Sequence, residues 1–441
     1  MSDQVQAPPQ LSFSPAAPPR RRLYYGWYIV MAASTVTFIE MAGFNTTFSV
    51  FIKPMTEEFG WTRAQFALGV TFGSLAAGIV VALVGRLIDR HGPKYVILGG
   101  AGLLTLCLAL LSQTSALWQL WLLFGLSRAV SSATLDLSTT VLVSNWFVDL
   151  RGRAMGLASL GRRFGIGLLP LMAQGLIVPF GWRVGWIGVA GTVALIGFLP
   201  TALIVKRRPE DIGLRPDGAA TDKAASPASA ASVRGRRVHR QDVSWTLKEA
   251  TRTPAFWLLM GAGCASFFVG GSVNLHQVAH MVDRGLSPTV AVTSLTVYAL
   301  AGAVGTLFWG WLTDYIPVRY CFAMNVVWAA LGVLLLNFTS SEFMAYFYAI
   351  FYGLAFGGMI PLTATAWADY FGRKALGSIR GAALIAQMVV NAIGPLFAGV
   401  VYDTYGSYQW AWVTFAGSYL AAMALILMAR VPRRPSETAA A

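Results

Sequence analysis

The sequence predicts an all-α membrane protein with twelve transmembrane helices in two pseudo-symmetric six-helix halves. Of its 441 residues, 56% are hydrophobic and only 12% are charged, well below the roughly 25% charged share of soluble domains. A charged turn at 85–94 separates two apolar stretches and has a weaker copy at 310–319. Pro170 and Pro395 are separated by the same interval. A repeat near the midpoint of an apolar chain indicates two related halves in a membrane.

The first half contains six windows of about 20 apolar residues, the length that crosses the hydrocarbon core of a bilayer. They cover residues 26–51, 65–88, 94–113, 117–145, 152–178 and 183–205. Most of the 45 glycines of the chain lie inside such windows rather than between them. This placement favours close helix packing in lipid.

The second half repeats the pattern after a long polar segment. Its windows cover residues 254–282, 289–313, 319–339, 343–368, 377–402 and 408–430. We therefore expect an N-terminal half at 23–206 and a C-terminal half at 253–430. The remaining segments are an Ala- and Arg-rich linker at 207–252, a disordered lead at 1–22 and a tail at 431–441.

The basic residues predict the orientation of the chain. With twelve spans, both ends and the linker lie on one side, and that side carries most of the 33 Lys and Arg residues. The opposite loops carry only Lys53, Arg63, Arg183 and Arg284. Because cytoplasmic loops carry the positive excess, we expect both termini to be cytoplasmic. The net charge of +14 is thus a topology signal, and no nucleic acid is expected as a partner.

Several classes of function are not favoured. The three cysteines, Cys107, Cys264 and Cys321, all lie in apolar spans and predict neither a disulfide framework nor a metal site. His276 and His280 share a helix face, but no acid or cysteine partner for zinc is visible nearby. The chain has no GxxxxGK[ST] loop, so ATP is not its energy source. We expect no enzyme activity and no cofactor.

The repeated turn predicts a cytoplasmic latch formed by Gly85, Asp89, Arg90 and Asp314. The two acids lie where their helices leave the membrane. There a carboxylate can accept hydrogen bonds from the free N–H groups of a neighbouring helix N-terminus. The alternative is a solvated loop in which the basic residues only follow the charge asymmetry.

With these residues in view, the sequence resembles the major facilitator superfamily. The pattern G-x-x-x-D-R-x-G-x-K between the second and third spans is the signature of that superfamily, and residues 85–94 match it. Residues 146–161, with Gly165, are similar to the helix-5 motif of monocarboxylate transporters. Residues 274–277 and 283–288 resemble bacterial members of the monocarboxylate and oxalate–formate group. The resemblance implies the major facilitator fold and a secondary transporter.

The chain departs from that group at its anion-binding positions. Relatives carry an arginine in the eighth span, whereas residues 289–313 contain no charge. Some relatives carry a lysine in the eleventh span, where the only basic residue here is Arg380, near the cytoplasmic end. The usual cation of the C-terminal half is therefore missing.

The charges inside the spans are the main candidates for function, because an ionisable side chain at mid-membrane costs at least about 2.5–3.5 kcal/mol. All five lie in the N-terminal half: Glu40, Arg128, Asp136, Arg162 and Arg163. Asp136 and the two adjacent arginines lie at similar depths on antiparallel spans, so one arginine can pair with Asp136. The other is rotated about 100° around the helix and could face the cavity. The alternative is a closed structural network that leaves nothing for a substrate.

The remaining candidates have two interpretations each. Arg128 is either a cavity residue or a packing partner of Asp136. Glu40 is either a proton-coupling or substrate residue or a hydrogen-bonded structural acid. His276 is either a proton sensor or substrate hydrogen-bonding residue, since histidine titrates near neutrality, or an interfacial gate residue. Uncharged substrate ligands are expected at Asn45, Tyr298 and Asn391.

Together these features predict a proton-coupled secondary transporter of a small organic anion, a monocarboxylate, in the inner membrane of a bacterium. Arg128, Arg162, Arg163, Asn45, Tyr298 and Asn391 would bind the anion, and Glu40, Asp136 or His276 would carry the coupling proton. The expected protein is monomeric and works by alternating access. Alternatives are an exporter of an amphipathic drug or metabolite, uptake of an uncharged nutrient, and a receptor that has lost transport.

Overall fold

The computed structural model describes residues 24–147, 150–218, 245–372 and 375–432. The expected lead at 1–22, most of the linker at 207–252 and almost all of the tail at 431–441 lie outside these residues. Nine helices of the described chain are long and apolar enough to cross a membrane, and a bent first helix makes a tenth. Two further helical runs of span length, at 63–91 and 117–146, complete twelve.

The helices of the N-terminal half follow the predicted windows closely. They are α1 (Gly26–Glu40), η1 (Met41–Gly43), α2 (Asn45–Phe48), η2 (Ser49–Phe51), α3 (Ile52–Phe59), α4 (Arg63–His91), α5 (Pro93–Leu111), α6 (Leu117–Ala129), η3 (Val130–Asp136), α7 (Leu137–Trp146), α8 (Arg151–Phe180), α9 (Trp182–Thr192), η4 (Val193–Phe198) and α10 (Leu199–Ile204). The first span thus continues through α3 instead of ending at residue 51.

The C-terminal half has the same number of spans. Its helices are α11 (Leu247–Ala250), α12 (Pro254–Asp283), α13 (Pro288–Leu312), α14 (Val318–Leu335), η8 (Leu336–Phe338), α15 (Glu342–Phe371), α16 (Leu376–Tyr405) and α17 (Gln409–Met428). Hydroxyl side chains at Thr253, Ser287 and Ser341 cap the first turns of α12, α13 and α15, which fixes where these helices begin.

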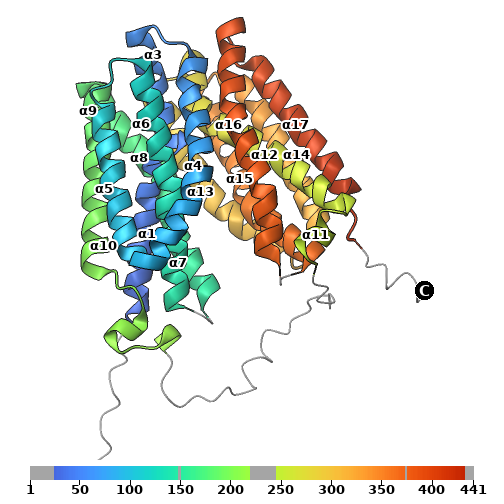
Figure 1. Cartoon of the computed structure of the whole chain (residues 1–441). Helices are drawn as coiled ribbons and strands as arrows, with labels where there is room; N and C mark the ends of the chain where they lie inside the picture. Colours follow the sequence, from blue (N-terminus) through green and yellow to red (C-terminus); the bar gives the residue numbers. More distant parts are fainter. Residues whose placement is uncertain (1–23, 148–149, 219–244, 373–374, 433–441) are drawn as a thin grey trace, which may run out of the picture.

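The two halves form bundles that lie close together at one end and diverge at the other, where α7, α10 and α11 are found (Figure 1). We call this diverging end the terminal side, because α1 begins there and α17 ends there, and we call the other end the opposite side. The halves meet mainly where α4 packs along α16 and α8 along α13.

Hydrogen bonds between the halves, within the described residues, occur at mid-depth and on the opposite side. Thr71 donates to the Ala392 carbonyl at 2.7 Å, and Thr296 donates to the Gly167 carbonyl at 2.9 Å. The molecule is therefore closed on the opposite side and spread on the terminal side.

Two of the helical spans contain π-helical segments. The segment η3 lies between α6 and α7 and ends at Asp136, and η4 lies between α9 and α10. Both pack against α5. Because π-turns widen a helix locally and change its register, η3 alters the angle between Arg128 and Asp136 from the value of a regular helix.

Candidate functional site

Arg162 of α8 forms the centre of a charged cluster at mid-depth. Its Nη2 lies 3.1 Å from Glu40 Oε2, at the end of α1, and also bonds to Asp136 Oδ1, at the end of η3. The structure thus brings together three of the charged residues that the sequence singled out. Two carboxylates share one guanidinium, so the cluster carries an excess negative charge when both acids are ionised.

The two acids of this cluster differ in exposure. The side chain of Glu40 is only 1% exposed, whereas those of Arg162 and Asp136 are 31% and 47% exposed. Glu40 Oε1 is buried and has no hydrogen-bond partner among the described residues. The charge of Glu40 is therefore stabilised by Arg162, while Asp136 is also accessible to solvent or a small molecule.

Arg163 follows Arg162 in the chain but points to the other half. Its Nη2 donates to the Thr306 hydroxyl of α13 at 2.9 Å. A Cβ on Gly302 would lie 2.9 Å from its Nη1, so this glycine makes room for the guanidinium. No ion pair of Arg163 with an acidic residue occurs in the part of the chain described.

Arg128 of α6 is a buried cation that is held by neutral groups. It donates to Ser74 Oγ at 3.0 Å, to Asn45 Oδ1 at 2.9 Å and to Asn391 Oδ1 at 3.1 Å. Its guanidinium also lies 4.9 Å from the centre of the Phe44 ring. The residue is 8% exposed, and none of the described acids forms an ion pair with it. In this conformation its partners are thus neutral groups, and its role as a cavity residue stays a prediction.

The two asparagines on Arg128 tie it to both halves. Asn45 donates its amide to the Gly271 carbonyl of α12, and Asn391 of α16 donates its amide to the Phe267 carbonyl, each at 2.9 Å. These bonds orient the amide oxygens toward the guanidinium. Arg128 is thus part of the contact between the halves.

The first span is broken between Glu40 and Asn45. The segments Gly26–Gly43 and Asn45–Phe59 meet at 49°, and Phe44 between them has an extended backbone. Gly43 packs so closely on α6 and η3 that a Cβ there would lie 2.6 Å from the Ser127 carbonyl oxygen and closer still to Ser131 Oγ. Only glycine fits at this contact, and the break places Glu40 and Asn45 on separate helical segments.

Replacing Gly43 with alanine should therefore displace the break in the first span. Overpacking of a tight contact costs about 1–3 kcal/mol, so we expect a lower unfolding temperature in detergent and weaker substrate binding. Gly102→Ala is the matched control, because nothing lies within 4 Å of a Cβ at that position. Equal stability of the two variants would contradict the close contact.

Tyr298, an expected substrate ligand, is buried among aromatic residues. Its hydroxyl donates to Asn274 Oδ1 at 3.1 Å, and its ring stacks on Tyr352 with 5.8 Å between the centres. The residue is 1% exposed. In this conformation Tyr298 is part of the packing of the C-terminal half.

His276 is fully buried and has both ring nitrogens bonded. Nε2 lies 2.9 Å from the Pro395 carbonyl and Nδ1 lies 2.9 Å from the Tyr408 hydroxyl. Since a carbonyl only accepts, Nε2 carries the proton and Nδ1 accepts from Tyr408. A proton-coupling role for His276 stays a prediction and requires the surrounding contacts to open.

Arg63, at the start of α4, joins this histidine to a set of contacts that we call the opposite-side gate. Its guanidinium donates to both carboxylate oxygens of Asp283, at 2.6 and 2.9 Å, and to the Tyr408 hydroxyl at 2.8 Å. The gate comprises Arg63, Ala64, Asp283, Asp403, Tyr408 and His276. A bidentate pair of this kind is strong and directional.

Asp403 of α16 completes the gate by capping a helix of the other half. Its two oxygens accept the backbone N–H groups of Arg63 and Ala64 at 3.0 and 2.9 Å. A carboxylate at a helix N-terminus is stabilised by the free N–H groups there. The sequence interpretation counted Arg63 only as a loop charge. The signal that could have revealed the gate is the scarcity of basic residues on that side.

The residues of the predicted latch lie on the terminal side and are not engaged with a helix N-terminus. Asp89, Arg90 and Asp314 are exposed, and neither carboxylate has a partner among the described residues. The Asp89 carbonyl accepts a bond from Arg207 at 3.2 Å. Gly85 has open space around it. The terminal side is spread in this conformation, and the latch stays a prediction for the state in which that side closes.

No group of three or more His, Cys, Asp or Glu residues suited to a metal ion occurs in the described ranges. His280 bonds to the Leu336 carbonyl through Nε2 at 2.8 Å. The two histidines thus bind backbone groups and a phenol.

Comparisons with known proteins agree with this architecture. The family model described as Major Facilitator Superfamily matches residues 33–293 and 272–441. Monocarboxylate transporter 13 of Rattus norvegicus is 25% identical over 410 residues, which are 92% of this chain and 88% of the relative. Monocarboxylate transporter 2 of Homo sapiens is 24% identical over 432 residues, 96% of this chain and 88% of the relative.

Among solved structures, a similar fold is that of a bacterial homolog to the human lysosomal transporter Spinster, in an inward-facing and unoccupied conformation. It superposes with a TM-score of 0.66 at 17% sequence identity and covers 92% of this chain and 95% of that one. At this identity the likeness concerns the fold.

Proposed function

We propose, from the premise that this chain belongs to the Major Facilitator Superfamily, that it transports a small organic anion, a monocarboxylate, in symport with a proton. Membership of that superfamily and homology to monocarboxylate transporters make the chain a multi-pass secondary transporter. The observation that carries the anion proposal is the charge of the site. The site contains three arginines but only two carboxylates: Arg162 pairs with Glu40 and Asp136, whereas Arg128 and Arg163 contact neutral groups of the other half.

The arginines without an acid are the proposed anion ligands. A guanidinium binds a carboxylate through two parallel hydrogen bonds. Arg128 and Arg163 make only bonds to neutral groups, and those bonds are easier to exchange for an anion than an ion pair is. Asn45 and Asn391 would keep Arg128 oriented while the anion binds.

Asp136 is the proposed site of the coupling proton. It is the exposed acid on Arg162, and Glu40 holds the same arginine from the buried side. When Asp136 accepts a proton, it loses its charge, and the arginine remains paired with Glu40. The site then has an additional positive charge, which favours the anion. Proton and monocarboxylate would thereby bind together.

Alternating access is proposed to proceed by rocking of the two halves. With the terminal side cytoplasmic, as the basic residues favour, the described conformation opens to the cytoplasm, and the opposite-side gate closes the outer face. The latch at Asp89 would form when the cytoplasmic side closes. The inner membrane of a bacterium is the proposed location.

Transport by the purified chain in proteoliposomes tests this proposal. We expect uptake of labelled L-lactate that rises when the outer pH is lowered. Arg128→Gln should raise KM about tenfold or more, since a hydrogen bond to a charged group contributes about 1.5–3 kcal/mol. Arg183→Gln is the control, because Arg183 pairs with Glu58 within the N-terminal half.

Other outcomes would identify the alternatives. Uptake of uridine or glucose without uptake of lactate, pyruvate or acetate would contradict an anion substrate. Efflux of an amphipathic dye from loaded vesicles would indicate an exporter. Absence of flux for every probe, with binding retained, would indicate a receptor.

A further inference from the structure

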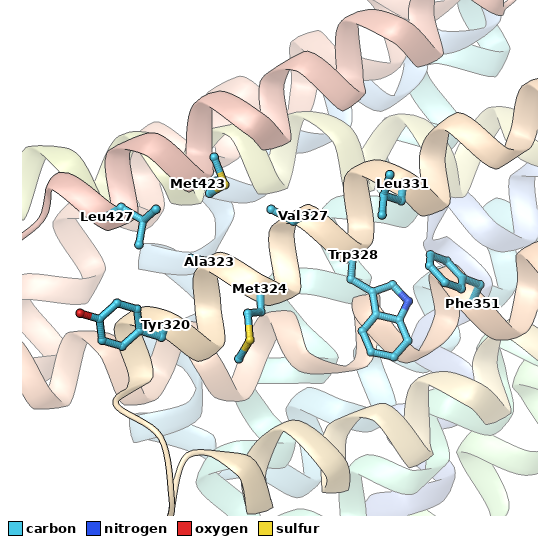
Figure 2. A pocket seen from close by; sticks show the side chains of 9 residues that line it. All are labelled: Tyr320, Ala323, Met324, Val327, Trp328, Leu331, Phe351, Met423 and Leu427. Carbon is cyan, nitrogen blue, oxygen red and sulfur yellow. The ribbon is translucent and has the colours of Figure 1, made fainter.

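An apolar groove lies on the surface of the C-terminal half, away from the charged site. It has a volume of about 620 Å³ and lies between α14, α15 and α17. Figure 2 shows Tyr320 and Leu427 at one end of the groove and Leu331 and Phe351 at the other. Because α14 begins on the terminal side, the Tyr320 end is the mouth nearest the membrane surface on that side.

The groove follows one stripe of α14. Residues 320, 323, 324, 327, 328 and 331 recur at the spacing of one helix face. The eleven steps from residue 320 to residue 331, at 1.5 Å each, give a length of ~16 Å, similar to much of an acyl chain. Ala323 forms a buried floor, whereas Met324 and Leu331 are 43% and 52% exposed along the rim. Met423 adds a second flexible thioether, and such side chains adapt to irregular apolar ligands.

Positive charge is found at the mouth of the groove. The Arg319 guanidinium lies 5.8 Å from the centre of the Tyr320 ring, and its Nε is buried without a hydrogen-bond partner among the described residues. Arg430 lies three residues after the lining residue Leu427, just past the end of α17 at Met428, and is exposed. Within the described ranges, neither arginine forms an ion pair, even though Asp314 is only five residues from Arg319.

We propose that this groove binds one acyl chain of an anionic glycerophospholipid, whose phosphate is held by Arg319 and Arg430. The apolar stripe fits the chain, and the two arginines fit the negative headgroup at the level where a headgroup lies. Arginine binds phosphate oxygens in a planar, two-pronged geometry. Anionic lipids are attracted to basic residues at the membrane surface. The groove is lined by the C-terminal half alone, so this lipid stabilises that half and is separate from the transported substrate.

Native mass spectrometry of the full chain in neutral detergent tests this proposal. Phosphatidylglycerol and phosphatidylcholine with the same acyl chains are added in equal amounts. The unchanged protein should retain phosphatidylglycerol about fivefold or more over phosphatidylcholine, and Arg319→Gln with Arg430→Gln should remove this preference. Arg215→Gln, which changes an exposed arginine of the linker, should leave it unchanged.

The acyl chain is tested separately. Ala323→Phe fills the floor of the groove and should lower retention of both lipids. If this variant folds poorly, Met324→Trp fills the groove from the rim and should have the same effect. Equal retention of the two lipids by the unchanged protein would overturn the proposal. So would a preference for phosphatidylglycerol that survives the double arginine change. A dimer that both apolar variants dissociate, without bound lipid, would show that a second copy occupies the groove instead.

Discussion

Replacing Arg162 with glutamine should destabilise the protein more than any other single change in the site. Removing one partner of a buried ion pair costs about 3–5 kcal/mol, because the other charge is left in a low-dielectric environment. Glu40 is that other charge, since its side chain is 1% exposed and Arg162 is its ion-pair partner among the described residues. We expect a large fall in the unfolding free energy, measured by chemical denaturation in detergent.

A second substitution in the Arg162→Gln variant shows which acid, Glu40 or Asp136, relies on Arg162 to stabilise its charge. Glu40→Gln combined with Arg162→Gln should recover most of the lost stability. Asp136→Asn combined with Arg162→Gln should recover little, because the side chain of Asp136 is 47% exposed and solvent already stabilises its charge. Arg163→Gln is the control for loss of an arginine at this depth, since it loses only its contact with Thr306. Rescue by Asp136→Asn in place of Glu40→Gln would refute this division of roles.

Replacing Arg63 with glutamine should open the opposite side of the molecule. Arg63 bonds to Asp283 and Tyr408 of the other half. Truncating one partner of a buried, hydrogen-bonded charge pair costs about 2–5 kcal/mol, which shifts a two-state equilibrium roughly 30-fold or more. Double electron–electron resonance measures the distance between two spin labels. With labels at positions 113 and 340, this distance should be longer in Arg63→Gln than in the unchanged protein.

Both labelling positions are exposed and lie in opposite-side loops of different halves. The free cysteines Cys107, Cys264 and Cys321 are first replaced with alanine. Arg183→Gln removes an opposite-side ion pair that stays within one half, so it should leave the distance unchanged. An unchanged distance in Arg63→Gln would mean that the other contacts, among them the Asp403 cap on the start of α4, hold this side closed without the Arg63 side chain.

The sequence was sufficient for the fold because each span is a long apolar run that ends at a polar turn. Predicted and observed helices differ by no more than three residues at most ends, for example 254–282 against Pro254–Asp283. The exception is the first span, which bends at Phe44 and continues to Phe59. That bend depends on the tight contact of Gly43 with another helix, which no local pattern reveals.

The site was only partly predictable. Counting residues from a shared turn placed Asp136 and the adjacent arginines at one depth, and the structure pairs Asp136 with Arg162. Which arginine pairs, and that Glu40 joins them, depends on helix rotation across the bundle. Arg128 contacts Asn45 and Asn391 instead of an acid. The π-helical segment η3 changes the angle between Arg128 and Asp136, and Asn391 lies on α16, which is far from Arg128 in the sequence but adjacent in the fold.

The capping of α4 by Asp403 has a consequence for the solvent. When the halves separate at this point, two backbone N–H groups and the carboxylates of Asp403 and Asp283 lose their protein partners together. Each must then bind water, since an unsatisfied polar group in an apolar environment is costly. Opening of the opposite side is thus a wetting transition as well as a rotation. The free energy of this opening therefore depends on water activity. Osmolytes that are excluded from the protein surface should favour the state in which the opposite side stays closed.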